Sequence, residues 1–162
     1  MVVLSEPRQT SAGCREWVVR PTMAIVPRPV RRLLVLVTGR RGTGKSTIVD
    51  AAASYLGAAV LSHNWAMSGL KPFPSVQNTL DSMDPPGHRR VGWSVPRALA
   101  REQLRRGSSV VLDSIARAEE IGDCRRLAGE ERGRFVLVVT DCRDRGLHRS
   151  RVEGRQRSIP GC

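Results

Sequence analysis

The sequence contains no apolar run close to the roughly 18 residues that a membrane-spanning helix requires. Its N-terminus also lacks the basic start, apolar middle and small-residue cleavage site of a signal peptide. The four cysteines, Cys14, Cys124, Cys142 and Cys162, include no Cys-x-x-Cys pair and lie too far apart to suggest a metal-ligand cluster. We therefore expect a cytoplasmic protein with free thiols in a reducing compartment.

Aromatic and acidic residues are also few. Aromatic residues make up 4% of the chain against 40% hydrophobic residues, so the core of a single 162-residue domain would be mostly aliphatic. The chain has 15 Asp and Glu against 27 Lys and Arg, a formal net charge of +12, and all but Lys45 and Lys71 of the basic residues are arginines. This charge indicates attraction to polyanions such as nucleic acid or nucleotides, or reflects the composition of the coding DNA. Both interpretations stay open, because the arginines are scattered and no aromatic residues interleave with them to stack on bases.

The strongest motif is a glycine-rich stretch that follows the apolar residues 33–37. It has the spacing of a complete P-loop, in which Gly39 and four further residues precede Gly44, Lys45 and Ser46. Its glycines let backbone N–H groups point at an anion, Lys45 can reach the outer phosphates of ATP, and the Ser46 hydroxyl can bind Mg²⁺. We expect the whole loop to bind the nucleotide: Gly39, Arg40, Arg41, Gly42, Thr43, Gly44, Lys45, Ser46 and Thr47.

Strands alternate with helices along the rest of the chain. The pattern predicts strands at 33–37, 58–62, 109–113 and 135–140, and helices at 46–56, 75–83, 93–106 and 119–130. A serine cap would begin the second helix. Pro96 would lie in the first turn of the third, with Leu99 and Leu104 on its apolar side. Ile121, Cys124 and Leu127 would form the apolar stripe of the fourth. Such alternation is typical of a doubly wound parallel α/β sheet that binds ligands at the carboxyl ends of its strands.

Two segments fall outside this pattern. Residues 1–31 contain four prolines and no sustained periodicity, so we predict an extension without packed structure. Residues 141–157 have no clear apolar face and hold six arginines between 143 and 157, of which Arg145/Arg149 and Arg151/Arg155 are four apart. This stretch is either a solvated helix or, since it follows a strand directly, a basic lid over phosphates.

These motifs together resemble the small bacterial P-loop kinases of the predicted AAA-type ATP-binding group, which are related to polynucleotide 5′-hydroxyl kinases and chloramphenicol phosphotransferases. The resemblance covers about residues 32–161 and is carried by residues 39–47, 110–113 and the arginine-rich 148–161. It implies a three-layer P-loop NTPase fold with an Arg-rich lid. It also implies that Asp113 acts opposite the metal, through water or directly, and that Arg151 and Arg155, with Arg149 as an alternative, stabilise the transferred phosphoryl group. A helix-capping role for Asp113 is the alternative to that metal contact.

The chain departs from this family in two places. Where relatives often carry a catalytic aspartate after the second strand, it reads Ser62-His63-Asn64-Trp65. Asn64 cannot take up a proton, whereas His63 could act as the base, with Asp81 and Asp84 as further candidates. The sequence also stops after the lid segment, so we expect residues 32–162 to form a kinase-like domain without the family's last strand and helix.

The expected activity is transfer of the ATP γ-phosphate to a hydroxyl of a small molecule or of a nucleic-acid 5′ end. Trp65 and Phe73, near the expected acceptor pocket, favour a flat organic acceptor, and the basic charge favours a polyanion. A catalytically impaired module that binds nucleotide or nucleic acid is the alternative.

Overall fold

The computed structural model describes residues 3–4, 8–9, 15–16, 19–20 and 32–154. The chain divides into two compact units, Met1–Val30 and Arg31–Cys162. The described residues of the first unit pair as short antiparallel strands, β1 (Val3–Leu4) with β4 (Val19–Arg20) and β2 (Arg8–Gln9) with β3 (Arg15–Glu16). The extension predicted at residues 1–31 falls mostly on residues outside the described ranges.

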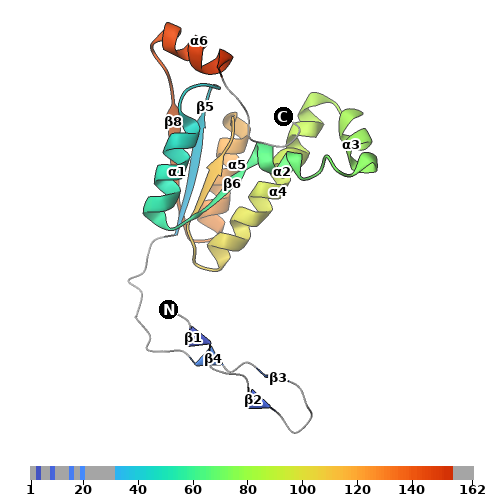
Figure 1. Cartoon of the computed structure of the whole chain (residues 1–162), viewed down its shortest axis with the longest axis vertical. Helices are drawn as coiled ribbons and strands as arrows, with labels where there is room; N and C mark the ends of the chain where they lie inside the picture. The colour runs from blue at the N-terminus through green and yellow to red at the C-terminus, as the bar shows by residue number, and fades with distance from the viewer. Residues whose placement is uncertain (1–2, 5–7, 10–14, 17–18, 21–31, 155–162) are drawn as a thin grey trace. The chain divides into compact units, whose positions relative to one another are not determined.

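A parallel sheet forms the centre of the second unit (Figure 1). Its strands are β5 (Leu33–Gly39), β6 (Ala59–Ser62), β7 (Val110–Asp113) and β8 (Arg134–Thr140), in the order β6-β7-β5-β8. All three strand pairs are parallel. The predicted four-stranded α/β fold is therefore confirmed, and the carboxyl ends of the strands meet at one edge of the sheet.

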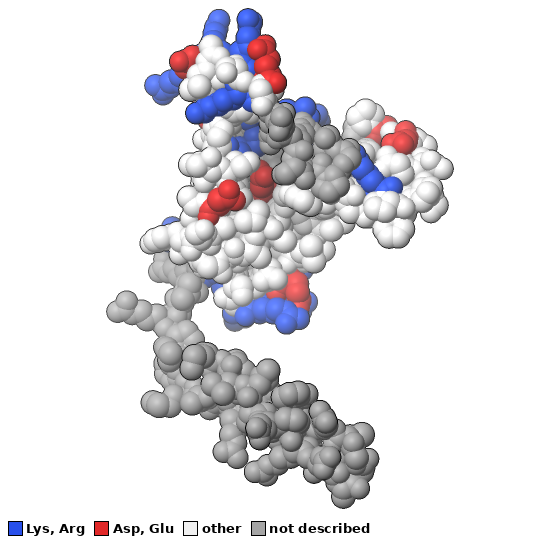
Figure 2. All heavy atoms as spheres, viewed as in Figure 1, with Lys and Arg blue, Asp and Glu red and all other residues white. Residues whose placement is uncertain are grey.

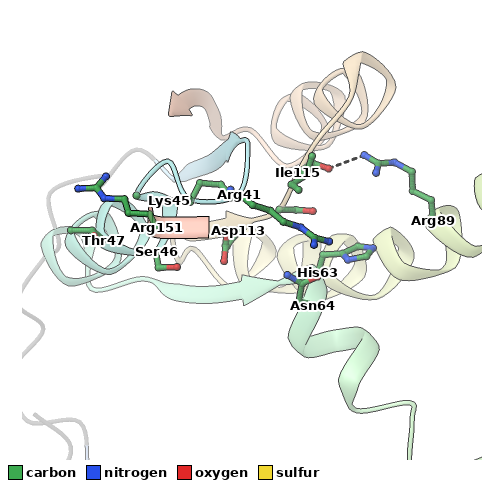
Figure 3. Close-up of a pocket in the computed structure, with 13 residues that line it drawn as sticks. Arg41, Lys45, Ser46, Thr47, His63, Asn64, Arg89, Asp113, Ile115 and Arg151 are labelled. Carbon is green, nitrogen blue, oxygen red and sulfur yellow. Dashed lines mark hydrogen bonds between the residues drawn. The ribbon is translucent and has the colours of Figure 1, made fainter. Parts of the chain in front are cut away.

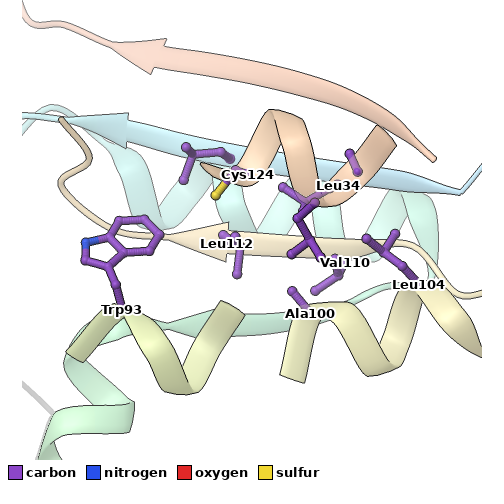
Figure 4. Packing of buried hydrophobic residues seen from close by; sticks show 10 residues of the cluster. Leu34, Trp93, Ala100, Leu104, Val110, Leu112 and Cys124 are labelled. Atoms are coloured by element: carbon purple, nitrogen blue, oxygen red, sulfur yellow. The ribbon is translucent and has the colours of Figure 1, made fainter. Parts of the chain in front are cut away.

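Alternation along β5 distributes its side chains between two helical layers. Leu34 and Leu36 are buried in a cluster that includes Trp93, Leu104 and Cys124 of the helices α4 (Pro85–Arg105) and α5 (Ala118–Glu130), as Figure 4 shows. Val35 and Val37 face the other way and pack with Val49 of α1 (Lys45–Leu56). A strand that is apolar on both faces is what a central parallel strand requires. Strand β5 therefore carries the P-loop at the middle of a three-layer α/β sandwich.

The sequence predicts that the third helix begins at residue 93, which is eight residues later than in the structure. Helix α4 starts at Pro85, where Asp84 caps it by accepting a 2.8 Å hydrogen bond from the Gly87 N–H. Prolines are tolerated in a first turn because its N–H groups have no partners within the helix. Pro96 consequently lies inside the helix and is buried, not in its first turn. The register also places Leu99 at the surface, 50% exposed, while Leu104 is buried as predicted.

The remaining helices are α2 (His63–Ser68), α3 (Pro74–Asp81) and α6 (Arg145–Glu153). Helix α2 is absent from the sequence prediction, since its six residues are too few to show periodicity. The predicted serine cap of α3 is wrong: Phe73 is the N-cap residue and no side chain caps the helix. The apolar stripe of α5 is confirmed, because Cys124 and Leu127 are buried and Ile121 packs against the same cluster. Within the described ranges, no helix is long and apolar enough to cross a membrane.

Candidate active site

The P-loop connects β5 to α1 and keeps the conformation that its glycines permit. Gly42 and Gly44 have φ angles of 79° and 84°, in the left-handed region that favours glycine. Gly44 is the N-cap of α1, no side chain caps this helix, and nothing lies within 4 Å of where a Cβ would stand on Gly44. An uncapped helix N-terminus beside open space is a favourable position for an anion.

Lys45 lies folded along the loop in this structure. Its Nζ donates hydrogen bonds to the carbonyl oxygens of Gly39 (2.9 Å) and Arg40 (2.6 Å). These contacts keep the ammonium group beside the loop, at the position from which a P-loop lysine reaches phosphate oxygens.

Three threonines fix the loop against its neighbours. The Thr43 hydroxyl donates to the Arg40 carbonyl (2.7 Å) and lies 2.6 Å from the Thr140 hydroxyl at the end of β8. The Thr140 hydroxyl also lies 3.2 Å from the carbonyl oxygen of Thr38, whose own hydroxyl accepts a 2.8 Å hydrogen bond from the Ala116 N–H. The loop is therefore held from both sides of β5, by β8 and by the turn after β7.

A pocket of about 480 Å³ lies at the carboxyl edge of the sheet (Figure 3). Strand register brings its walls together, because Asp113 of β7 pairs with Val37 of β5 and with Ser62 of β6, directly before His63. The residues that line it come from the P-loop, the ends of β6 and β7, and helices α1, α2, α4 and α6: Arg41, Gly42, Gly44, Lys45, Ser46, Thr47, His63, Asn64, Arg89, Asp113, Ser114, Ile115 and Arg151.

The pocket wall is strongly cationic. Arg41, Lys45, Arg89 and Arg151 line it, and among the described residues Asp113 is the one carboxylate that does. The described residues contain no cluster of three or more His, Cys, Asp or Glu side chains suited to a metal ion. Ser46 and Asp113 line the same pocket and so fit the predicted role of holding Mg²⁺ jointly with nucleotide phosphates, the usual arrangement for this ion.

His63 lines the pocket but packs tightly against α4. Its Nε2 is buried and has no hydrogen-bond partner among the described residues. This atom lies where a Cβ on Gly92 would stand, so the glycine makes room for the imidazole. Burial, and then the nearby positive charge of Arg89, lower the pKa of His63. The imidazole is therefore neutral at pH 7, as a general base must be, but Nε2 faces α4 and only Nδ1 remains for that role.

Helix α6 contacts the P-loop directly. His148 Nε2 lies 2.7 Å from the Arg41 carbonyl oxygen, and the Val152 methyl group would be 2.8 Å from a Cβ on Gly42. The helix begins at Asp144, whose carboxylate accepts a 2.9 Å hydrogen bond from the Leu147 N–H. Basic side chains gather over α6 (Figure 2), and of its arginines Arg151 lines the pocket.

The structure brings many of the predicted site residues to this pocket, although their roles stay predictions. Three predicted residues belong to the loop but do not line the pocket: Gly39, Arg40 and Thr43. Arg149 is in α6 and does not line the pocket either. Arg155 lies outside the described residues. The alternative bases lie elsewhere: Asp81 accepts from Gln77 within α3, and Asp84 caps α4. Sequence reasoning missed Arg89, Thr38 and Thr140, and only the threonines carry a local signal, as polar residues at the ends of apolar strands.

A parallel sheet whose central strand leads through a P-loop into a helix defines the protein as a P-loop α/β protein. The AAA domain model AAA_33 matches residues 34–160, so the chain belongs to this family.

Solved structures of kinases share this fold. The APS kinase CysC of Mycobacterium tuberculosis, in complex with AMPPNP and APS, is 22% identical with a TM-score of 0.57 over 76% of this chain and 70% of that chain. A chain of the Pnkp1/Rnl/Hen1 RNA repair complex is 18% identical with a TM-score of 0.56, over 80% of this chain and 40% of that chain. A gluconokinase of Sinorhizobium meliloti is 19% identical with a TM-score of 0.52, over 78% of this chain and 67% of that chain. The comparison with curated proteins gives no match.

Proposed function

We propose that this protein is an ATP-dependent kinase that transfers the γ-phosphoryl group to a hydroxyl of a small molecule or of a nucleic-acid 5′ end. One observation carries the proposal: a single pocket joins the phosphate-binding loop to a second wall made by His63, Asn64 and Arg89. A protein that only bound nucleotide would need the first wall and not the second. Phosphoryl transfer consists mostly of positioning and charge neutralisation, which this wall composition suits.

In this proposal the P-loop and Lys45 hold the phosphates of ATP, and Ser46 and Asp113 hold Mg²⁺ with them. The ion would supply charge neutralisation on the phosphate oxygens. Arg151 and Arg41, which both line the pocket, would neutralise the charge of the moving phosphoryl group. The γ-phosphorus to bridging-oxygen bond breaks, the acceptor oxygen bonds to phosphorus, ADP leaves, and the hydroxyl proton passes to a base or to solvent.

His63 is our candidate for that base, through Nδ1. Asp81 and Asp84 are weaker candidates, because neither lines the pocket. In a largely dissociative transfer the base contributes late, so loss of the His63 imidazole would slow transfer and not abolish it.

The test is ATP-binding calorimetry followed by a screen for transfer of γ-labelled phosphate to oligonucleotides and hydroxylated metabolites. We expect binding to depend on Mg²⁺ and Lys45→Ala to abolish transfer. Lys71→Ala is the matched control, since Lys71 is the other lysine and does not line the pocket. Transfer that survives Lys45→Ala would refute the mechanism.

A second candidate is a nucleotide-binding module without transferase activity. It is favoured by Asn64 at the position where the kinases that this sequence resembles often carry an aspartate, and by the orientation of His63 Nε2 toward α4. ATP and Mg²⁺ that raise the melting temperature, with no acceptor labelled across the screen, would support this candidate over the kinase.

A further inference from the structure

Arg89 stands apart from the other cations of the pocket. Arg41 and Lys45 come from the P-loop region and Arg151 from α6, whereas Arg89 comes from α4. In Figure 3 it lies across the pocket from Lys45 and Thr47, on the side of His63. A charge in this position lies across the pocket from Lys45 and Thr47 and faces whatever occupies the second wall.

The guanidinium of Arg89 is fixed in place. Its Nε is ion-paired with Glu120 of α5, and its Nη2 donates a 2.8 Å hydrogen bond to the Ile115 carbonyl oxygen. Glu120 is itself anchored, because its other carboxylate oxygen accepts a 2.7 Å hydrogen bond from the Arg117 N–H. Only 23% of the Arg89 side chain is exposed, so the group pays little further ordering cost when it binds a ligand.

The same contacts leave one end of the guanidinium available. Nε and Nη2 each have an acceptor, in Glu120 and in the Ile115 carbonyl oxygen, and Nη1 has no partner among the described residues. The two N–H groups of Nη1 can therefore donate charge-assisted hydrogen bonds to an oxyanion.

One carboxylate, Glu120, contacts Arg89 at Nε, and the described residues that form the rest of the second wall carry no negative charge. Asn64 is neutral, and His63 is uncharged at pH 7. Arg89 therefore keeps a donor for an acceptor anion at Nη1, on the side of the pocket across from Lys45 and Thr47.

We propose that the acceptor carries, besides its reactive hydroxyl, an anionic oxygen group such as a phosphate or carboxylate, which Arg89 binds. This inference rests on the proposed kinase function and narrows its substrate class: neutral sugars and nucleosides are excluded as good acceptors. Arg89 is then a specificity-determining residue that discriminates acceptors by charge.

The test measures binding to protein saturated with AMPPNP and Mg²⁺, so that the P-loop is filled and no transfer occurs. Three matched pairs serve as probes: glycerol 3-phosphate and glycerol, gluconate and glucose, and adenosine 3′-phosphate and adenosine. In at least one pair the wild type should bind the anionic member at least tenfold more tightly. Arg89→Gln should remove that preference, Arg89→Lys should keep part of it, and both should bind AMPPNP within twofold of the wild type.

Arg97→Gln is the matched control. Arg97 lies on the same helix and is also ion-paired to α5, through Asp123 (2.5 Å), but it is 44% exposed and does not line the pocket. Arg97→Gln should leave the preference for the anionic probe intact, although it removes an α4–α5 ion pair as Arg89→Gln does.

The proposal is overturned if no anionic probe is preferred, if Arg89→Gln keeps the preference, or if Arg89→Gln weakens AMPPNP instead. Transfer assays on the same probes separate the two proposals. Arg89-dependent anion binding without transfer from ATP would refute the kinase and support the subsite. Equal transfer to neutral and anionic acceptors would refute the subsite and support the kinase.

Discussion

Replacement of Gly39 by alanine tests how closely the P-loop strand approaches the end of β8. Gly39 has a φ of 140°, and a Cβ built on it would overlap the Thr140 carbonyl oxygen and hydroxyl. The carbonyl oxygen belongs to the backbone and cannot rotate away. Because Gly39 pairs with Thr140 in the β5–β8 ladder, relief requires the two strands to separate at the start of the loop.

Two terms set the expected loss of unfolding free energy. The backbone conformation costs a non-glycine residue about 1–3 kcal/mol. Overpacking against a fixed neighbour costs about 1–3 kcal/mol more. Gly57→Ala is the reference for a positive φ without an overlap, because Gly57 is in the left-handed region (φ 57°) and has open space around its Cβ position. We expect about 1–2 kcal/mol for Gly57→Ala and about twice that or more for Gly39→Ala.

Urea unfolding followed by circular dichroism gives both values. The overlap involves a backbone oxygen, so Thr140→Ala should not rescue Gly39→Ala, although it removes the hydroxyl. ATP binding should fall with Gly39→Ala and persist with Gly57→Ala. If Gly39→Ala destabilises no more than Gly57→Ala, or if Thr140→Ala rescues it, the close approach of β5 and β8 is wrong.

Two further predictions follow from burial of titratable groups. The pKa of His63 is lowered on folding, so the unfolded chain binds more protons below pH 6.5 and stability falls as pH decreases through that value. His63→Gln should flatten unfolding free energy against pH between 7 and 5, and an unchanged slope would contradict the burial of His63. Burial raises the pKa of Cys124 to about 12, so it should resist thiol reagents at pH 8 until the protein unfolds, whereas Cys142, which is only partly buried, should react in the folded state. Peptide mapping of labelled thiols checks this, and rapid native labelling of Cys124 would refute it.

The nucleotide half of the pocket could be predicted from sequence because its determinants are local. An apolar strand, a glycine pattern and the following helix occupy one continuous stretch, and each residue constrains its neighbours. Asp113 could also be predicted to reach this edge, since it ends an apolar strand in a parallel sheet. The apolar stripe of α5 could also be predicted, because helical periodicity is a local pattern in the sequence.

The proposed acceptor half could not be predicted in this way. Its arginine is in a part of α4 that the prolines at 85 and 86 made resemble a loop, although prolines fit a first helical turn. The partner that orients Arg89, Glu120, is 31 residues further along the chain. Leu99 was misplaced because it is five residues from Leu104, about 140° around a helix, so the two side chains cannot share one buried face.

This asymmetry follows from what each half must recognise. ATP phosphates are the same in every kinase, so a local backbone motif suffices to bind them. The acceptor differs between kinases, and in the proposed site it would face side chains that two separate helices, α2 and α4, contribute. Gly92 illustrates why such a site depends on contacts between distant residues. From the sequence of α4 alone a glycine would only weaken the helix, yet its missing side chain leaves the space that His63 occupies. Gly92→Ala should therefore displace His63 and reduce acceptor binding more than ATP binding. Gly122→Ala, on α5 with nothing near its Cβ position, should stabilise the fold by about 0.5–1 kcal/mol and change neither.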